Sequence, residues 1–380
     1  MQRRDFLTHA GLGALAGTAA LTGCGKKDEN APAQKATASG EVIHWKLVSA
    51  APKNFPGLGT GAENIARYIN ELSGGRLSVK VYGAGELVPA FETFDAVSRN
   101  TAQIGHGGGS YYWKGKHEAT QYFTTVPFGL TAQEMNAWLF YGGGLELWQE
   151  LYAPFNLVPM PGGNSGVQMG GWFNREIRSL ADLKGLKMRI PGLGGEVLTR
   201  VGVTAVNLPG AELFMALQNG TIDAAEWVAP YNDLAFGFHK VAKYYYAPGW
   251  HEPGSTVEAF INKQALDGLP PDLRHIVLNA CKLANADMLA EYTARNHASL
   301  ETLLNQHGVP VRRFPDDVLT ALRNTTLQVM EEIAARDPFS RRVHDSLMGF
   351  LEQVRGWTDI SELAYLIARD GLPGTKGDNA

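Results

Sequence analysis

The order of short strands and amphipathic helices is the feature of this 380-residue chain that most limits its fold. Residues 42–48 alternate apolar and polar side chains and contain several β-branched residues, which predicts a strand. A helical pattern follows over 61–72, a strand over 77–82, a helix over 91–98 and a short strand near 102–104. Strands and helices in this order, with short connections, predict an open and mainly parallel α/β sheet.

A second α/β cycle begins near Leu157. The expected strands span 167–173, 187–190, 205–208, 222–227, 255–262 and 310–314. The expected helices span 131–152, 194–201, 211–218, 233–238, 316–336, 339–355 and 359–369, with a short helical turn at 180–183. From Pro271 an apolar stripe continues with helical spacing to about Leu304, and its length predicts a helix that crosses between two lobes.

The first 23 residues have the pattern of an export signal. A pair of arginines precedes a run of small and apolar residues over 10–21, which is too short to span a bilayer as a helix. The letters RRDFL resemble the twin-arginine export motif, and LTGC resembles a lipobox in which Cys24 is lipidated. The alternatives are an ordinary basic signal-peptide start and an unmodified cysteine. Residues 24–40 contain almost nothing to bury, which predicts a flexible tether.

Composition narrows the class of protein. A hydrophobic content of 44% and a charged content of 19% are typical of a soluble globular chain, and a net charge of −4 argues against a nucleic-acid partner. The two cysteines cannot form a disulfide framework if Cys24 is lipidated, and Cys281 lies on the long apolar stripe, which indicates a packing role. No later stretch is apolar enough to span a membrane, so we expect the body of the protein to be extracytoplasmic.

Polar residues stand at the ends of two predicted strands, Arg189 before Pro191 and Glu226 with Trp227 before Pro230, and Gln168 lies on a third strand. Ligands of open α/β sheets bind outside the carboxyl ends of the strands, so these residues are the candidates for a binding site. The planar guanidinium of Arg189 suits a carboxylate because it donates two parallel hydrogen bonds. The alternative, an exposed arginine, is less favoured because Arg189 ends an apolar strand and a glycine-rich turn follows.

A cation is a second expectation for this site. Glu226 would repel an anionic ligand unless a cation lay between them, although it could instead form an ion pair with Arg189. Gln168, Glu226 and the carbonyl of Trp227 offer hard oxygen donors, which suit Na⁺ or Ca²⁺ better than zinc. Calcium needs about six to eight oxygens, and a 2-oxo or 2-hydroxy acid could supply two by chelation. Glu252 is the next candidate ligand; its alternative is a surface residue of a turn.

Other catalytic or cofactor sites have weak support in the sequence. None of the ten histidines forms a pair spaced for zinc, and no G-x-S-x-G elbow is present. The glycines of residues 105–119 do not form a dinucleotide-binding motif. In the same segment, Tyr111 and Tyr112 could line the mouth of a pocket or simply pack against a neighbouring helix.

Four blocks of the sequence carry a family resemblance. They are GVQMGGWF (166–173), KMRIPGLGGE (187–196), DAAEWVAPY (223–231) and YYYAPGWHEPG (244–254). Together they resemble the solute-binding proteins of tripartite ATP-independent periplasmic (TRAP) transporters, in the branch that binds 2-oxo acids and related monocarboxylates. The resemblance covers most of residues 41–370.

The resemblance implies a two-lobe, periplasmic-binding-protein-like α/β fold with a ligand cleft between the lobes, a long lobe-crossing helix and C-terminal helices. The branch also resembles proteins that form homodimers by exchanging a C-terminal helix, which would involve residues 339–370. The expected boundaries are 1–23 for the signal peptide, 24–40 for the tether, 41–164 for lobe 1, 165–252 for lobe 2, 253–282 for a return to lobe 1, 283–336 for the crossing helix and the completion of lobe 2, and 337–380 for the C-terminal helices.

The resemblance also implies roles for single residues. Arg189 would hold the ligand carboxylate, and Gln168 and Glu226 would coordinate the metal. Trp227 would add a carbonyl ligand and a packing face. The side chains that would close over the ligand from the other lobe are Tyr111, Tyr112 and Phe55. Cys24 is a departure, because most soluble members of the family have no lipid anchor.

The first functional hypothesis is a lipid-anchored extracytoplasmic protein that binds a small carboxylate with a metal ion and delivers it to a sodium-driven TRAP permease. A secreted enzyme that acts on small carboxylates at the same metal is the alternative from another class. No general base stands out beyond the candidate metal ligands, which argues against the enzyme. A sensor that binds the same ligand without a permease is a third possibility.

Overall fold

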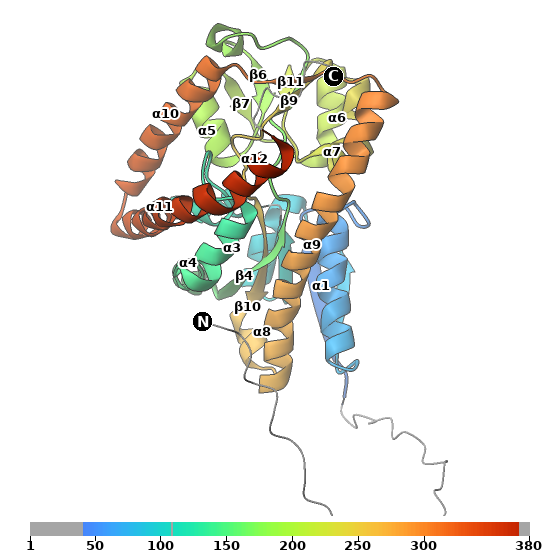
Figure 1. The fold of residues 1–380 in the computed structure, drawn as a ribbon. Helices are drawn as coiled ribbons and strands as arrows, with labels where there is room; N and C mark the ends of the chain where they lie inside the picture. The colour runs from blue at the N-terminus through green and yellow to red at the C-terminus, as the bar shows by residue number, and fades with distance from the viewer. Residues whose placement is uncertain (1–40, 108, 372–380) are drawn as a thin grey trace, which may run out of the picture. The chain divides into compact units, whose positions relative to one another are not determined.

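The computed structural model of this protein describes residues 41–107 and 109–371, without the side chain of Tyr111. The predicted signal peptide, the tether and Cys24 lie outside the described residues. All described residues belong to one compact unit, Gly40–Ala380. Within it the strands form two separate sheets (Figure 1).

The first sheet has five strands in the order β2-β1-β3-β10-β4. They are β1 (Ile43–Ser49), β2 (Leu77–Tyr82), β3 (Ile104–Gly107), β4 (Leu157–Asn164) and β10 (Thr256–Asn262). β1 is parallel to β2 and β3, whereas β10 is antiparallel to β3 and β4. The carboxyl ends of β1, β3 and β4 therefore meet the start of β10 at one edge of the sheet.

The second sheet has six strands in the order β11-β9-β5-β8-β6-β7. They are β5 (Gly171–Phe173), β6 (Lys187–Arg189), β7 (Thr204–Val206), β8 (Ala224–Ala225), β9 (Tyr244–Ala247) and β11 (Val311–Arg313). β6 is parallel to β7 and β8, and β5 is antiparallel to β8 and β9. The carboxyl ends of β6, β8 and β9 thus meet the start of β5.

Helices cover both sheets, as Figure 1 shows. Near the first sheet lie α1 (Leu58–Leu72), α2 (Thr93–Ser98), α3 (Ala132–Tyr141), α4 (Gly144–Tyr152) and α8 (Lys263–Asp267). Near the second lie α5 (Gly192–Arg200), α6 (Gly210–Gln218), α7 (Pro230–Phe236) and α10 (Asp316–Ala334). The C-terminal part comprises α11 (Pro338–Thr358), a π-helical turn (Asp359–Leu363) and α12 (Ala364–Asp370).

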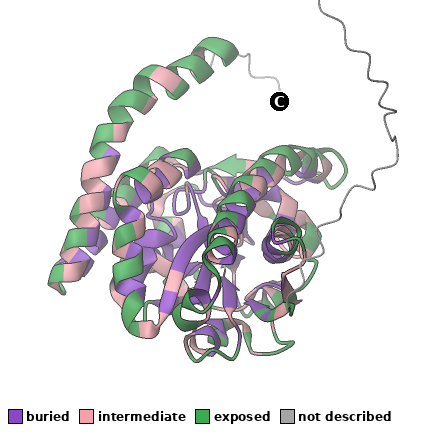
Figure 2. Cartoon of the chain, turned by 90° about the horizontal axis from the view of Figure 1, so that it is seen from below, coloured by how far each residue is buried: buried purple, intermediate pink, exposed green. Residues whose placement is uncertain are grey.

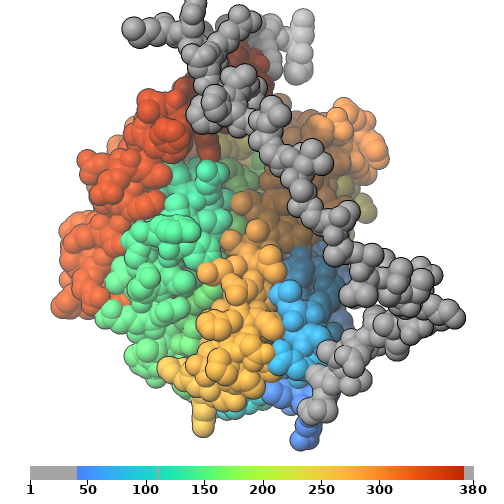
Figure 3. All heavy atoms as spheres, turned by 60° about the horizontal axis from the view of Figure 1, so that its bottom comes forward, coloured from blue at the N-terminus to red at the C-terminus, as the bar shows by residue number. Residues whose placement is uncertain are grey.

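The predicted crossing helix is α9 (Pro271–Asn305), which has 35 residues and a length of about 52 Å at 1.5 Å per residue. Its buried stripe enters three apolar clusters in turn. Residues Leu273 to Ala284, including the buried Cys281, pack in the core of the first sheet. Tyr292 packs in a cluster beside the strand ends, and Leu303 packs in the core of the second sheet. Figure 3 shows the first half of α9 between α1 and the α3–α4 pair.

Two helical predictions differ from the structure in detail. The expected helix over 131–152 is two helices, because Gly143 adopts a left-handed backbone conformation with φ of 84° between α3 and α4. Conversely, the helices expected at 339–355 and 359–369 are joined through the π-helical turn and make one long rod. In Figure 2 this rod extends beyond the rest of the described body, and its end is exposed. Large apolar side chains exposed there are Trp357, Ile360, Leu363, Tyr365 and Leu366.

Among the strands, the second sheet departs most from expectation. The strands predicted at 167–173 and 222–227 are shorter in the structure, where they are β5 and β8. Gln168 and Glu226 lie outside these strands, in the segments beside the cavity. β9 was not predicted: its residues, YYYA, are aromatic rather than β-branched, and they pair with both β5 and β11. The α/β fold class and the two-sheet arrangement agree with the expectation.

Candidate functional site

Two adjoining cavities lie where the strand ends of the two sheets meet. The first, called here the polar cavity, is lined by Leu58, Tyr112, Ser165, Gln168, Arg189, Trp227, Val228, Ser255 and Val257. The second, the apolar cavity, is lined by Ala50, Ala51, Leu58, Ala90, Phe91, His106, Gly107, Tyr112, Pro209, Gly210, Trp227 and Val257. Each cavity has walls from both sheets, and the four residues common to both join them into one region.

Arg189 is the last residue of β6 and is 1% exposed. Its Nε donates to the carbonyl of Leu208 at 3.2 Å, and its Nη1 donates to the carbonyl of Glu226 at 2.7 Å. Its Nη2 donates to the hydroxyl of Tyr112 at 3.3 Å, which links the second sheet to the segment that follows β3. Backbone carbonyls on two sides therefore fix the plane of the guanidinium at the cavity wall.

Glu226 follows β8 and is fully buried. Its Oε2 lies 3.1 Å from Nη1 of Arg189, and its Oε1 lies 3.4 Å from Nε2 of His251. Oε1 accepts no hydrogen bond from the described part of the chain. Burial raises the pKa of Glu226 to about 8 even though Arg189 lowers it, because one guanidinium does not offset the loss of hydration.

Gln168 lines the polar cavity, and Glu252 contacts it. Nε2 of Gln168 donates to Oε2 of Glu252 at 2.7 Å and to Oγ of Ser165 at 3.0 Å. The hydroxyl of Ser255 also donates to Oε2 of Glu252. Oε1 of Gln168, like Oε1 of Glu226, is buried and has no hydrogen-bond partner among the residues that the structure describes.

Glu252 is 4% exposed, so the structure does not support its alternative as a surface turn residue. Burial raises the pKa of Glu252 to about 7, and the nearby carboxylate of Glu226 raises it further. Two buried carboxyl groups thus share the positive charge of Arg189. This environment favours an additional positive charge.

Gly249 allows the backbones of the GVQMGGWF and YYYAPGWHEPG blocks to lie close together. Its N–H donates to the carbonyl of Gln168 at 2.9 Å, and a Cβ at position 249 would lie 2.2 Å from that oxygen. The N–H of Gln168 in turn donates to the carbonyl of Glu252 at 3.1 Å. The PGW block therefore places Gln168 and Glu252 side by side, and only glycine allows so close a contact.

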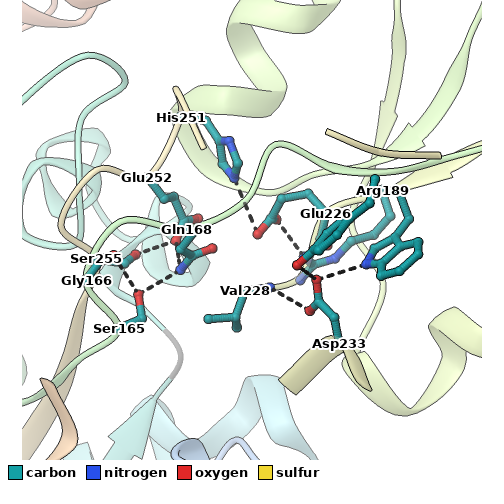
Figure 4. Close-up of polar contacts among 12 residues, drawn as sticks. Ser165, Gly166, Gln168, Arg189, Glu226, Val228, Asp233, His251, Glu252 and Ser255 are labelled. Carbon is teal, nitrogen blue, oxygen red and sulfur yellow. Dashed lines mark hydrogen bonds and ion pairs between the residues drawn. The ribbon is translucent and has the colours of Figure 1, made fainter. Parts of the chain in front are cut away.

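His251 is a site residue that the sequence reasoning missed. It is 2% exposed and points toward Glu226, as Figure 4 shows. One ligand atom from each of Glu226, His251 and Glu252 lies within 4.8 Å of the others. Burial lowers the pKa of His251 to about 4, so the imidazole is neutral near pH 7. A search for paired histidines could not find it, because its partners are two glutamates.

The donor set fits a hard cation. One buried amide oxygen, Oε1 of Gln168, and one buried carboxylate oxygen, Oε1 of Glu226, accept no hydrogen bond from the described residues. A carboxylate oxygen of Glu252 lies within 4.8 Å of a carboxylate oxygen of Glu226. Oxygen donors of this kind suit Na⁺ or Ca²⁺, whereas zinc prefers nitrogen and sulfur ligands. The single neutral imidazole in the group does not change that preference.

The aromatic residues predicted for the site lie in different places. The ring of the half-buried Trp227 is 5.0 Å from the guanidinium carbon of Arg189, and both Trp227 and Tyr112 line the two cavities. Phe55 packs on Phe236 with ring centroids 4.6 Å apart and is not among the residues that line either cavity. The side chain of Tyr111 lies outside the described part of the structure.

Comparison with known proteins identifies the family. Residues 48–337 match the DctP family, described as bacterial extracellular solute-binding protein family 7. The chain belongs to this family. None of the helices in the described residues combines the length and apolar character that crossing a membrane requires.

Among relatives of this DctP-family protein is a monocarboxylate 2-oxoacid-binding periplasmic protein from Nostoc sp. It is 40% identical over 365 residues, which cover 96% of this chain and 98% of the relative. The agreement over almost the whole length of both proteins confirms the family resemblance seen in the sequence.

Two solved TRAP solute-binding proteins have the same fold. The one from Pseudoalteromonas atlantica, with bound sodium and pyruvate, is 44% identical, with 86% of this chain and 99% of that chain covered and a TM-score of 0.83. The one from Bordetella bronchiseptica is a dimer with calcium and picolinate in one of its sites. It is 38% identical, with 87% and 98% covered and a TM-score of 0.84. These matches confirm the predicted two-lobe fold class.

Asp233 is a second residue of this DctP-family protein that the sequence reasoning did not assign to the site. It is 1% exposed and accepts hydrogen bonds from Nε1 of Trp172 at 2.9 Å and from the hydroxyl of Tyr245 at 2.7 Å. It also accepts from the N–H of Val228 at 3.4 Å, so it anchors the turn that follows Trp227. Burial raises the pKa of Asp233 to about 7, although its hydrogen-bond donors lower it.

We expect Asp233→Asn to flatten the dependence of stability on pH. The folded pKa of about 7 exceeds the ordinary value of 3.8, so the folded state binds the extra proton between these values. The free energy of unfolding should therefore be highest near pH 4 and fall as the pH rises to 7, by at most about 4 kcal/mol from this group. Urea denaturation of both proteins from pH 4 to 7, with a chelator present, measures the difference.

The exposed Asp317 provides the matched control. Asp317→Asn should retain the pH dependence of the unaltered protein. Equal slopes for the unaltered protein and Asp233→Asn would contradict the assignment of this pH dependence to Asp233.

Proposed function

We propose that this protein is the extracytoplasmic solute-binding component of a TRAP transporter and that it binds a small 2-oxo or 2-hydroxy monocarboxylate, such as pyruvate, 2-oxobutyrate or lactate, together with Na⁺ or Ca²⁺. The observation that carries the proposal is the wall of the polar cavity. Arg189 and Gln168 line this cavity, and Oε2 of Glu226 lies 3.1 Å from the guanidinium. Oε1 of Gln168 and Oε1 of Glu226 accept no hydrogen bond from the described residues. Such a wall offers a carboxylate clamp and a cation cage in one place.

The chemistry of the cage explains the ligand class. The side-chain oxygens of Gln168 and Glu226, the carbonyl of Trp227 and the carboxylate of Glu252 would hold the cation. A cation that prefers six or more oxygens requires more donors than these residues supply, and a chelating acid provides two. A relative that binds 2-oxo acids and a fold neighbour with sodium and pyruvate support this assignment.

Arg189 would then hold the ligand carboxylate. Its fork geometry permits two parallel charge-assisted hydrogen bonds, and the indole of Trp227 supplies a packing face beside it. Tyr112 would close over the ligand from the segment after β3, and Tyr111 and Phe55 would complete this cover. The bond between Arg189 and Tyr112 supports such a closure, because it joins the two sheets at the cavity.

The proposed activity is binding and delivery without chemical turnover. A TRAP permease in the membrane would receive the ligand. A secreted enzyme or a sensor remains the competing class, and product formation from a bound 2-oxo acid by the purified protein would favour the enzyme.

Export and anchoring complete the proposal. The twin-arginine-like motif and the lipobox would direct the chain across the membrane and attach it through a lipid on Cys24. The protein would then stay beside its permease instead of diffusing freely. Detergent-phase partitioning of the full-length protein from cells measures the anchor; recovery only in the aqueous phase would contradict it.

Self-association through the C-terminal helices is a further part of the proposal. The row of exposed apolar side chains from Trp357 to Leu366 would be covered in a homodimer. The Bordetella bronchiseptica neighbour, which is a dimer, supports it.

We expect carboxylate binding to depend on the cation. Protein freed of Na⁺ and Ca²⁺ by a chelator and a sodium-free buffer should bind pyruvate at least tenfold more weakly, because two carboxyl groups and the ligand then lack a shared positive charge. Addition of Na⁺ or Ca²⁺ should restore the affinity measured by calorimetry. Glu226→Gln should weaken the response to the cation by on the order of tenfold, because charge count sets cation affinity. Pyruvate affinity that is independent of every cation would overturn the cage.

We expect Arg189→Lys to weaken pyruvate binding by roughly 10- to 100-fold, which corresponds to about 1.5–3 kcal/mol for a charge-assisted hydrogen bond. Lysine keeps a positive charge near Glu226 but cannot donate two parallel bonds. The control is Arg200→Lys at an exposed ion pair with Glu332. Unchanged affinity in Arg189→Lys, with normal thermal unfolding, would refute the clamp.

We expect removal of residues 359–380 to convert a dimer into a monomer in sedimentation velocity, because the deletion removes four of the exposed apolar side chains, namely Ile360, Leu363, Tyr365 and Leu366. Pyruvate affinity should stay within about twofold, because residues 359–371, the described part of the deleted segment, do not line either cavity. Deletion of residues 372–380 alone is the matched control and should leave the dimer intact. A monomeric full-length protein, or a dimer that survives the longer deletion, would disprove the assignment.

A further inference from the structure

Glu258 is a buried carboxylate outside the wall described above. It lies on β10 and is fully buried. Its Oε2 accepts hydrogen bonds from Oγ of Ser110 at 3.2 Å and from the hydroxyl of Tyr152 at 2.8 Å. Its Oε1 accepts from Nε1 of Trp113. Three elements that are far apart in the sequence therefore meet at one side chain.

Two of these three donors belong to a single turn. Ser110 and Trp113 are the first and last residues of the 3₁₀-helix Ser110–Trp113, which carries Tyr112. Tyr152 instead belongs to α4, which packs against β4 in the body of the first sheet. Glu258 thus connects the turn that carries Tyr112 to the frame of the protein.

The position of Glu258 on β10 suits this connection. Val257 lines both cavities, whereas Glu258, the next residue, contacts the turn. Successive side chains of a strand point to opposite faces of the sheet. β10 therefore contributes one residue to the cavity wall and the next residue to the anchor behind it.

The turn depends on such an anchor because of what precedes it. Gly109, with φ of 157°, directly precedes the turn, and glycine leaves the backbone few steric limits there. Within the turn, the ring of Tyr112 packs on Phe91 with ring centroids 4.7 Å apart, and its hydroxyl accepts a hydrogen bond from Arg189. The position of Tyr112 at the cavity is thus determined by the bonds that hold its turn.

The electrostatics also single out Glu258. Burial raises its pKa to about 7, and among the described residues Tyr152, Trp113 and Ser110 lower it by hydrogen bonding. A buried carboxyl group held by neutral donors alone is costly compared with an apolar side chain of similar size. A leucine or methionine at this position would avoid that cost but could not accept hydrogen bonds. Glu258 accepts them from both ends of the turn.

We propose that Glu258 is a positioning residue for the ligand site, which holds the Ser110–Trp113 turn so that Tyr112 faces Arg189 across the polar cavity. The role rests on the proposed binding of a carboxylate at that cavity. Glu258 does not touch the ligand. It sets affinity through the orientation of Tyr112, because a side chain that is already in place loses less freedom when the ligand binds.

Two single substitutions separate positioning from general stability. Ser110→Ala removes a donor inside the turn, and Tyr152→Phe removes a donor of similar geometry that belongs to the frame. Ser110→Ala should weaken pyruvate binding about 3- to 10-fold, mainly through faster dissociation. Tyr152→Phe should keep the affinity for pyruvate within about twofold of the unaltered protein. Its thermal unfolding midpoint should nevertheless fall by about as much as that of Ser110→Ala. Equal losses of affinity in both variants, or in neither, would overturn the proposal.

A double-mutant cycle tests whether the effect passes through Tyr112. Glu258→Gln offers one acceptor oxygen in place of two and should weaken pyruvate binding about 3- to 10-fold in the otherwise unaltered protein. In a Tyr112→Ala background the same substitution should change the dissociation constant by less than twofold, because the side chain to be positioned is gone. Additive effects would overturn the positioning role.

Different results would overturn the proposed function and the role of Glu258. If the unaltered protein binds no 2-oxo or 2-hydroxy acid in the presence of Na⁺ or Ca²⁺, the proposed function and the role of Glu258 both fall. If it binds pyruvate but the Ser110, Tyr152 and Glu258 variants follow stability alone, only the positioning role falls.

Discussion

The buried ion pair between Arg189 and Glu226 is the interaction on which the rest of the site depends. Removing two charges from water costs more than their attraction returns unless further bonds satisfy them. Here the backbone carbonyls of Leu208 and Glu226 accept hydrogen bonds from the arginine, whereas Oε1 of Glu226 accepts none from the described chain and has Nε2 of His251 3.4 Å away. Glu252 adds a second buried carboxyl group. Two carboxyl groups thus stand against one guanidinium, and the proposed cation with its chelating ligand would balance them.

The two sheets supply this arrangement through a shared geometric rule. Carboxyl ends of parallel strands gather at one edge of a sheet, and loops at that edge can hold polar side chains that the sheet interior cannot. The second sheet contributes the guanidinium and the oxygen donors, and the first contributes Ser165, Ser255 and the turn of Tyr112. The edges stay opposed because α9 packs with the cores of both sheets, and because a further core cluster contains residues of both, among them Phe260 of the first sheet and Phe173 of the second.

The sequence predicted those parts of the site that strand position and residue chemistry determine. Arg189, Gln168 and Glu226 stand at strand ends, and the periodic stripe of α9 is legible without a structure. His251, Asp233 and Glu258 were not assigned, because what makes them important is a partner distant in the sequence. Glu258 meets Tyr152 across 106 positions and Ser110 across 148. Likewise β9 forms because β5 and β11 flank it, which no local pattern of its tyrosines reveals.

The proposed site would discriminate by chelation as well as by charge. An acid with a single carboxylate could meet Arg189, but it would leave the cation short of oxygen donors and the buried glutamates poorly balanced. A 2-oxo or 2-hydroxy acid supplies the extra oxygen at the adjacent carbon, so one small molecule satisfies both the guanidinium and the cation. Tyr112, held from behind by Glu258, meets Arg189 from the opposite sheet. In the proposed function, affinity for the ligand would therefore be tied to the contact between the two lobes, as a protein that first retains and then releases its cargo requires.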